Sequence, residues 1–167
     1  MKIGSLCPFK FINMKRIILT ILCILCTMAV GFSQEKGSNE IPDSITGNYF
    51  VKHGGEDSKV KIFKKADGTY CAQVYWLQNR LDSNGNVRLD ENNPDKSKRN
   101  TPCDQIILME GISYNGAKKR WDGGKIYDPT RGIRANATCS FDTDSTLKIR
   151  GSVMGIGETV VWKKIAE

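Results

Sequence analysis

Histidine is nearly absent from this sequence, and its scarcity removes most of the usual catalytic arrangements. His53 is the only histidine of the 167-residue chain, so a Ser-His-Asp or Cys-His site would have to use it. A zinc site is disfavoured as well, since one histidine and scattered cysteines give no closely spaced pair of ligands. We therefore expect no catalytic residues, no metal and no cofactor, and a hydrolase built on His53 is the enzymatic alternative.

Long apolar runs are absent after residue 33, and the one near the start of the chain reads as a targeting segment. This run extends over 17–30, follows Lys15 and Arg16, and precedes a Gly-Phe-Ser triplet. A basic start, a short apolar stretch and small residues before a cleavage point are typical of a secretory signal peptide. We predict a signal peptide over 1–33, with Met14 as an alternative start, and a periplasmic or secreted product.

Two alternatives to a cleaved signal peptide remain. The apolar run could be an uncleaved anchor, although it is short for a membrane-spanning helix. Lipidation of Cys23 or Cys26 is disfavoured, because the residue before a lipidated cysteine should be small and Leu22 and Leu25 occupy those positions. We expect no stable membrane insertion after signal cleavage.

Removal of 1–33 changes both the charge and the cysteine count. The segment carries four basic residues and no acidic one, so the net charge falls from +7 to +3. That value is mild, and we expect no nucleic acid partner. Cys71, Cys103 and Cys139 remain, which allows one disulfide and a spare thiol. For Cys71 and Cys139 we favour the role of small buried residues.

The rest of the chain alternates with a period of two. Over 133–141 and 147–153, apolar residues occupy every second position, which sends one face of each segment to a core and the other to water. Further strands are predicted over 45–52, 58–64, 69–77, 105–111, 119–127 and 159–165. About eight short strands favour an all-β, antiparallel barrel in a single domain over 45–167, after a flexible leader over 34–44.

One long polar connection interrupts the regular spacing of strands. It extends over 78–104, and a loop of this length is usually functional or disordered. Its segment 82–86 resembles a calcium loop in outline, but Arg80 stands where the first carboxylate ligand is needed. A solvated turn is the alternative that we favour.

Aromatic and basic side chains on the predicted strands are candidates for a ligand site. Trp76, Trp121 and Trp162 fill a core in the simplest interpretation, and in the functional one they wall a shared cavity. The polar side chains that would join them are Tyr75, Tyr127 and Arg150, with Arg99 from the long loop. An inward Arg150 would need a carboxylate from the protein or a ligand, whereas an outward one is ordinary surface.

The segment 121–132, Trp-Asp-Gly-Gly-Lys-Ile-Tyr-Asp-Pro-Thr-Arg-Gly, is distinctive. With Asn93-Pro94-Asp95 before it and 147–151 after it, the chain resembles a family of exported bacterial proteins, domain of unknown function 2147. The chain departs from that family at 48–49, where a tryptophan is usual, and at Glu158, where arginine is common. The resemblance implies a small calycin- or lipocalin-like barrel with no established activity, and Pro129 and Gly132 fit a tight turn.

Two functions are therefore open. The first is non-enzymatic binding of a small, mostly apolar ligand, with or without an anionic group, and its contacts would be Tyr75, Trp121, Tyr127, Arg150, Trp162 and Arg99. The second is a structural or interaction module of the cell envelope whose barrel is filled by side chains and whose long loop contacts a protein partner. The size of the inward side chains separates the two, because a filled interior excludes a central ligand.

Overall fold

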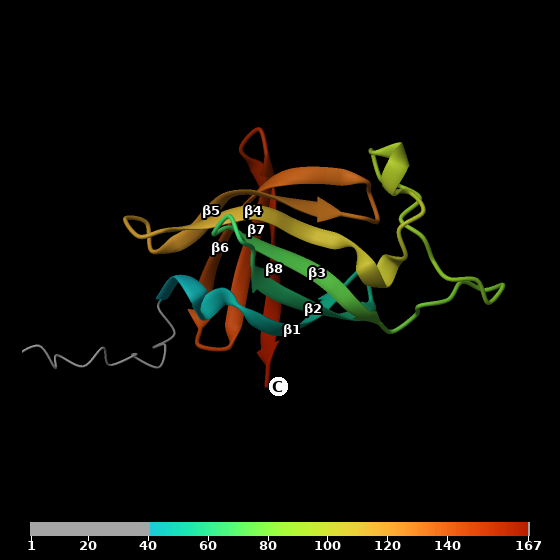
Figure 1. Ribbon diagram of the computed structural model, residues 1–167, viewed down its shortest axis with the longest axis horizontal. Coiled ribbons are helices and arrows are strands. Elements are labelled where there is room, and N and C mark those ends of the chain that lie inside the picture. Colours follow the sequence, from blue (N-terminus) through green and yellow to red (C-terminus); the bar gives the residue numbers. More distant parts are fainter. Residues whose placement is uncertain (1–40, 167) are drawn as a thin grey trace, which may run out of the picture. The chain divides into compact units, whose positions relative to one another are not determined.

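The computed structural model describes residues 41–166, so the expected signal peptide and residues 34–40 of the leader lie outside the described residues. Within 41–166 the chain forms a closed antiparallel barrel, in which consecutive strands pair and β1 pairs with β8 (Figure 1). The eight strands are β1 (Gly47–His53), β2 (Glu56–Lys64), β3 (Tyr70–Leu77), β4 (Ile107–Asn115), β5 (Arg120–Asp128), β6 (Ile133–Thr143), β7 (Thr146–Val153) and β8 (Ile156–Ile165). In this part of the chain, no helix has the length and apolar character needed to cross a membrane.

The two-residue period sorts side chains as the sequence predicts. In β7, Leu147 and Ile149 are fully buried, while Lys148 and Arg150, which alternate with them, are exposed. The neighbouring strand keeps this division, since Cys139 of β6 lies opposite Ile149 and is also buried. The prediction of an all-β, eight-stranded barrel is therefore confirmed, and the largest difference is β4, which begins and ends later than expected.

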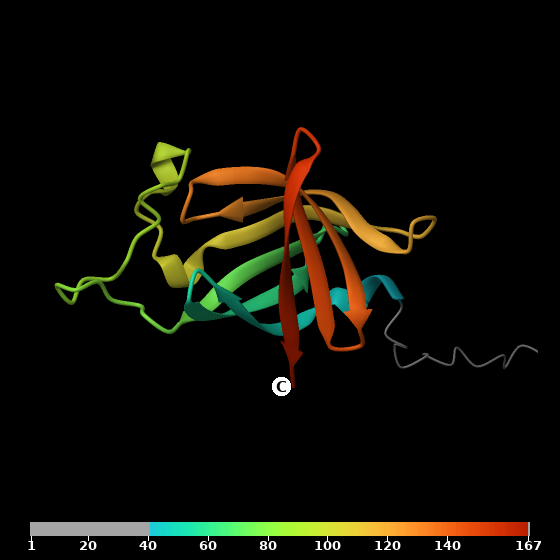
Figure 2. The same ribbon diagram turned by 180° about the vertical axis from the view of Figure 1, so that it is seen from behind.

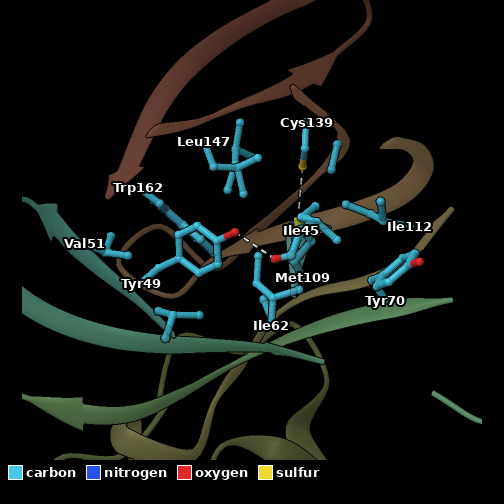
Figure 3. Packing of buried hydrophobic residues seen from close by; sticks show 14 of the residues in the cluster. Ile45, Tyr49, Val51, Ile62, Tyr70, Met109, Ile112, Cys139, Leu147 and Trp162 are labelled. Carbon is cyan, nitrogen blue, oxygen red and sulfur yellow. Dashed lines mark hydrogen bonds between the residues drawn. The ribbon is translucent and has the colours of Figure 1, made fainter. Parts of the chain in front are cut away.

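The interior of the barrel is filled by large side chains (Figure 3). Tyr49 and Trp162 lie against each other, with ring centroids 6.2 Å apart. The sulfur atoms of Cys139 and Met109 are 3.6 Å apart deeper in the same core. The side chains that are less than 2% exposed include Tyr49, Tyr70, Ile45, Ile62, Met109, Ile112, Leu147 and Ile149. Such packing gives the barrel the dry, dense centre of an ordinary protein core.

A short 3-10 helix, η1 (Ile41–Ile45), packs against one end of the barrel. Ile45 is fully buried and its carbonyl accepts a 2.7 Å hydrogen bond from the Tyr49 hydroxyl. The indole of Trp121 donates to the carbonyl of Pro42 over 2.9 Å. Residues 41–44 were expected to belong to a flexible leader, and they are helical because strand residues distant in sequence satisfy their backbone groups.

The long connection between β3 and β4 folds back on itself. It contains two 3-10 turns, η2 (Lys96–Lys98) and η3 (Cys103–Gln105), and isolated bridges join Leu81 to Val87 and Leu89 to Pro102. Figures 1 and 2 show it extending from the side of the barrel at which β3 ends and β4 begins.

Candidate functional site

The six side chains that the sequence suggests as ligand contacts do not share one cavity. Trp121 and Trp162 belong to the filled core, at 3% and 2% exposure. Tyr75 is exposed on β3, and Arg150 points outward from β7. Only Tyr127 and Arg99 belong to one network, in which Asp90 and Asn93 of the long loop connect them. The simple interpretation, as core residues, describes Trp121 and Trp162. It is wrong for Trp76, which is 41% exposed on β3 and has the Lys59 ammonium 5.2 Å from its ring centre.

Tyr127 anchors the long loop to the outer face of the barrel. It follows Ile126, whose side chain faces the interior next to Gly151, so Tyr127 lies on the other face of β5. Its hydroxyl donates a 2.7 Å hydrogen bond to the carboxylate of Asp90, which is 3% exposed. Burial, followed by the bond to Asp90, raises the pKa of the Tyr127 hydroxyl.

We call Tyr127, Asp90 and the residues that contact them the loop anchor, and this group contains further hydrogen bonds. Asp90 also accepts a 2.6 Å hydrogen bond from the buried side-chain amide of Asn93. The Arg99 guanidinium donates to the carbonyl of Asn93 over 2.8 Å. The guanidinium of Arg134 lies 5.1 Å from the centre of the Tyr127 ring and pairs with Glu110 at 2.7 Å. The buried side chains of the anchor, Tyr127, Asp90 and Asn93, thus have hydrogen-bond partners inside the protein, which is typical of a structural contact.

The turn between β5 and β6 is the second place at which the barrel contacts the long loop. The Asn92 amide donates to the carbonyls of Pro129 and Thr130, at 3.3 and 3.1 Å. Gly132 has a φ of +66°, and a Cβ there would lie 2.2 Å from the Asn92 carbonyl oxygen. The Asp128 carboxylate accepts hydrogen bonds from the backbone amides of Thr130 and Arg131 in the same turn. The predicted turn at this motif is confirmed, and the motif also holds the loop.

A groove of about 640 Å³ opens at the end of the barrel next to η1, and we call it the end groove. Its apolar lining comes from Ile62, Phe63, Ile165 and Ala166. Three lysines, Lys61, Lys64 and Lys164, also line it. An apolar surface with several cations at its edge is suited to a molecule with a hydrocarbon part and an anionic group.

The three lysines of the end groove are held differently. The Lys164 side chain passes over Gly47, whose missing Cβ leaves it room, and its ammonium donates to the carbonyl of Ser44 over 2.8 Å. Burial lowers the pKa of Lys164. Lys64 pairs with Asp43 at 2.9 Å. Lys61 has no ion-pair partner among residues 41–166, so it is the cation most available to a ligand.

Sequence reasoning did not single out these lysines. Alternation does place Lys61 on the outer face of β2, but the groove depends on β8 closing against β1, where Asn48 lies opposite Ile165. These residues are distant in sequence, and no local pattern predicts their pairing.

The cysteines and the other proposed sites can now be placed. Cys71, Cys103 and Cys139 are free thiols, and Cys71 and Cys139 are buried, as the sequence predicted. Across residues 41–166, no group of three His, Cys, Asp or Glu side chains could hold a metal ion. Asp82, from the calcium-like segment, instead accepts hydrogen bonds from the amides of Asn84 and Asn86, as in a solvated turn.

The closed antiparallel barrel with a 3-10 helix at its end is a lipocalin-like fold. It is similar to a solved structure described as "Protein HP1028 from the human pathogen Helicobacter pylori belongs to the lipocalin family", with a TM-score of 0.60 and 21% identity over 74% of this chain and 84% of that chain. The family model described as "Uncharacterized protein conserved in bacteria (DUF2147)" matches residues 47–164, and the chain belongs to this family. The resemblance stated from the sequence is thus confirmed. Curated protein sequences give no match.

Proposed function

We propose that this protein is a non-enzymatic, exported binding protein that holds an anionic amphiphile, such as a fatty acid, in the end groove. The observation that carries the proposal is the joint lining of this groove by apolar side chains and three lysines. The groove's volume of about 640 Å³ lies within the range of small-molecule sites, roughly 300–1,000 Å³.

Because side chains fill the core, the proposed ligand site lies at the end of the barrel rather than in its centre. Tyr49, Trp162 and Met109 occupy the space that a central ligand would need. Opening that space would separate well-packed side chains, which costs several kcal/mol in typical cores. A site at the end of the barrel requires no such change, because the groove is already open.

Export is part of the proposal and is supported by the sequence alone. The basic start and short apolar run before residue 33 fit a cleavable signal peptide. The mature protein would then meet lipids and their breakdown products in the envelope or outside the cell.

Paired ligands test the proposal. Dodecanoate and dodecanol share a hydrocarbon chain and differ in charge, so we expect calorimetry to show tighter binding of dodecanoate. Lys61→Gln should lower the affinity for dodecanoate by about tenfold, since a charged hydrogen bond contributes about 1.5–3 kcal/mol, and should leave dodecanol unchanged. Lys96→Gln, in η2 on the long loop, is the matched control.

Three results would contradict the proposal: no saturable binding of either ligand, equal binding of both by the wild type, or an equal effect of the two lysine substitutions. Native mass spectrometry of protein purified from its own envelope would add the identity of a retained lipid.

The second candidate function is an interaction module of the cell envelope with a side-chain-filled barrel. The exposed turn between β7 and β8 favours it, because Met154 and Ile156 are 98% and 84% exposed. Exposed apolar side chains at a loop tip often mark contact surfaces. Failure of the dodecanoate experiment would leave this candidate as the better account.

A further inference from the structure

A second groove, of about 200 Å³, lies on the outer face of β5, β6, β7 and β8, and we call it the outer-face groove. Three cationic side chains line it, from Arg120, Lys148 and Arg150. Three hydroxyl side chains also line it, from Thr138, Ser140 and Thr159. β7 and β8, which carry part of this surface, are in front in Figure 2.

The strand register places these groups in two rows across the sheet. Arg150 lies directly between Thr138 of β6 and Thr159 of β8. In the next row on the same face, Lys148 lies opposite Ser140. Cβ atoms of directly opposed residues are about 4.5–5.5 Å apart. Thr138, Arg150 and Thr159 line the same groove, so a small group bound there can contact the guanidinium and both hydroxyls.

Arg150 differs from its cationic neighbours in having no carboxylate. Arg120 pairs with Asp122 at 3.0 Å, and Lys148 pairs with Asp142 at 2.7 Å. For Arg150, the structure of residues 41–166 gives no ion pair and no side-chain hydrogen bond. Its planar guanidinium keeps five donors available in a fork that matches tetrahedral oxyanions.

We propose that the outer-face groove binds a phosphate group, with Arg150 as the central contact and the Thr138 and Thr159 hydroxyls as flanking donors. A phosphate monoester carries about −1.5 to −2 charges at neutral pH and three acceptor oxygens. Three acceptors correspond to one guanidinium and two hydroxyls. A groove of about 200 Å³ is smaller than typical sites for drug-sized ligands, so it suits a single phosphate rather than a large molecule.

This site is separate from the end groove and shares no lining residue with it. The phosphate can be free or can belong to a lipid headgroup, and these two sources can be distinguished. Titration of the purified protein with inorganic phosphate, at constant ionic strength, tests the free anion by amide chemical shifts. Sedimentation with vesicles of phosphatidylcholine, with or without phosphatidic acid, tests the lipid phosphate.

Arg150→Gln should weaken phosphate binding by about tenfold, because it removes charge-assisted hydrogen bonds. Thr159→Val keeps the shape and strand preference of the residue but removes the hydroxyl, and should weaken binding by about threefold. Lys163→Gln is the matched control. It removes one charge from an exposed position on β8 that does not line the groove, and should change the affinity less than twofold.

The phosphate titration and the vesicle experiment each have results that support or overturn the proposed phosphate site. Saturable, Arg150-dependent binding of inorganic phosphate supports a site for the free anion. Arg150-dependent binding to phosphatidic acid vesicles alone supports the same site for a lipid phosphate. No saturable binding in either experiment, or equal losses with Arg150→Gln and Lys163→Gln, overturns the proposal. Lys61→Gln in the end groove should leave phosphate binding intact, so this result is independent of the proposed function.

Discussion

The hydroxyl of Tyr127 and the carboxylate of Asp90, which are 37 positions apart, meet at 2.7 Å beneath the long loop. Both residues are 3% exposed. Neither group has water to replace its partner, so the bond fixes the loop to the outer face of β5. The loop is thereby part of the folded unit rather than an appendage to it.

Tyr127→Phe should destabilise the protein. The change removes one hydroxyl and leaves the buried Asp90 with one hydrogen bond fewer, a loss of about 1–3 kcal/mol. Urea unfolding would measure it, and amide hydrogen exchange over the long loop should accelerate more than exchange in β7. Tyr114→Phe is the control, because the Tyr114 ring packs on Trp121 and its hydroxyl makes no hydrogen bond within residues 41–166. Equal free energies for the two variants would contradict the role of the loop anchor.

Gly132→Ala should weaken the second contact of the long loop with the barrel, at the turn between β5 and β6. Two effects act together: the left-handed φ of +66°, and a Cβ placed 2.2 Å from the Asn92 carbonyl oxygen. Gly155→Ala isolates the first effect, since Gly155 has a φ of +84° and open space around it. The strain alone costs about 1 kcal/mol.

We expect Gly132→Ala to lower the free energy of unfolding by at least about 1 kcal/mol more than Gly155→Ala. Thermal unfolding of both variants provides the comparison. Similar losses of unfolding free energy in the two variants would show that the long loop moves away from the added Cβ at Asn92 with little energetic cost.

The strands were predictable because their signal is local. The alternation in β6 and β7 could be read from neighbouring residues, and it placed Leu147 and Ile149 in the core correctly. The contacts of η1 and of the long loop were not predictable. Trp121 reaches Pro42 across 79 positions of the chain.

Tyr127 shows that the local sequence also predicts the candidate site incompletely. Strict alternation from the buried Trp121 would put Tyr127 on the same face of β5, but the strand register shifts between Trp121 and Gly124, so that Tyr127 lies on the outer face. The long loop above it explains its burial there. The six suggested ligand contacts were chosen by residue type, and residue type does not say which face of a closed barrel a side chain occupies. Arg150 is the exception, because the alternation in β7 already assigns it to the face opposite Leu147 and Ile149, and the structure places it outward.

The contact between η1 and the barrel should weaken in acid. Hydrogen bonds from Lys64 and Tyr70 lower the pKa of Asp43. A carboxyl group with a lowered pKa in the folded state stabilises that state above its unfolded pKa, near 3.9, and loses this contribution as the pH falls through its folded pKa. The wild type should therefore be more stable than Asp43→Asn at pH 7, and the difference should shrink and then disappear as the pH falls below the unfolded pKa and through the lowered folded pKa.

The size of that difference is small because Asp43 and Lys64 are both partly exposed. Solvent screening limits it to less than about 1 kcal/mol. Urea unfolding of the two proteins from pH 2 to pH 7 would measure it. A difference that stays constant over this range would show that Asp43 acts through packing rather than through its charge.

Cys139 should resist alkylation as long as the barrel is folded. Burial raises the pKa of its thiol to about 12, so only about one thiol in 10⁴ is a thiolate at pH 8. Cys103 is partly exposed, and although burial also raises its pKa, iodoacetamide can reach it. Mass spectrometry after labelling at pH 8 should show Cys103 modified first and Cys139 modified only when urea unfolds the chain.

Raising the pH from 7 to 9 should accelerate labelling of Cys103 and leave Cys139 protected, because access rather than ionisation alone protects Cys139. Modification of Cys139 in the native protein at a rate near that of Cys103 would mean that the interior opens, and a ligand in the barrel centre would then have to be reconsidered.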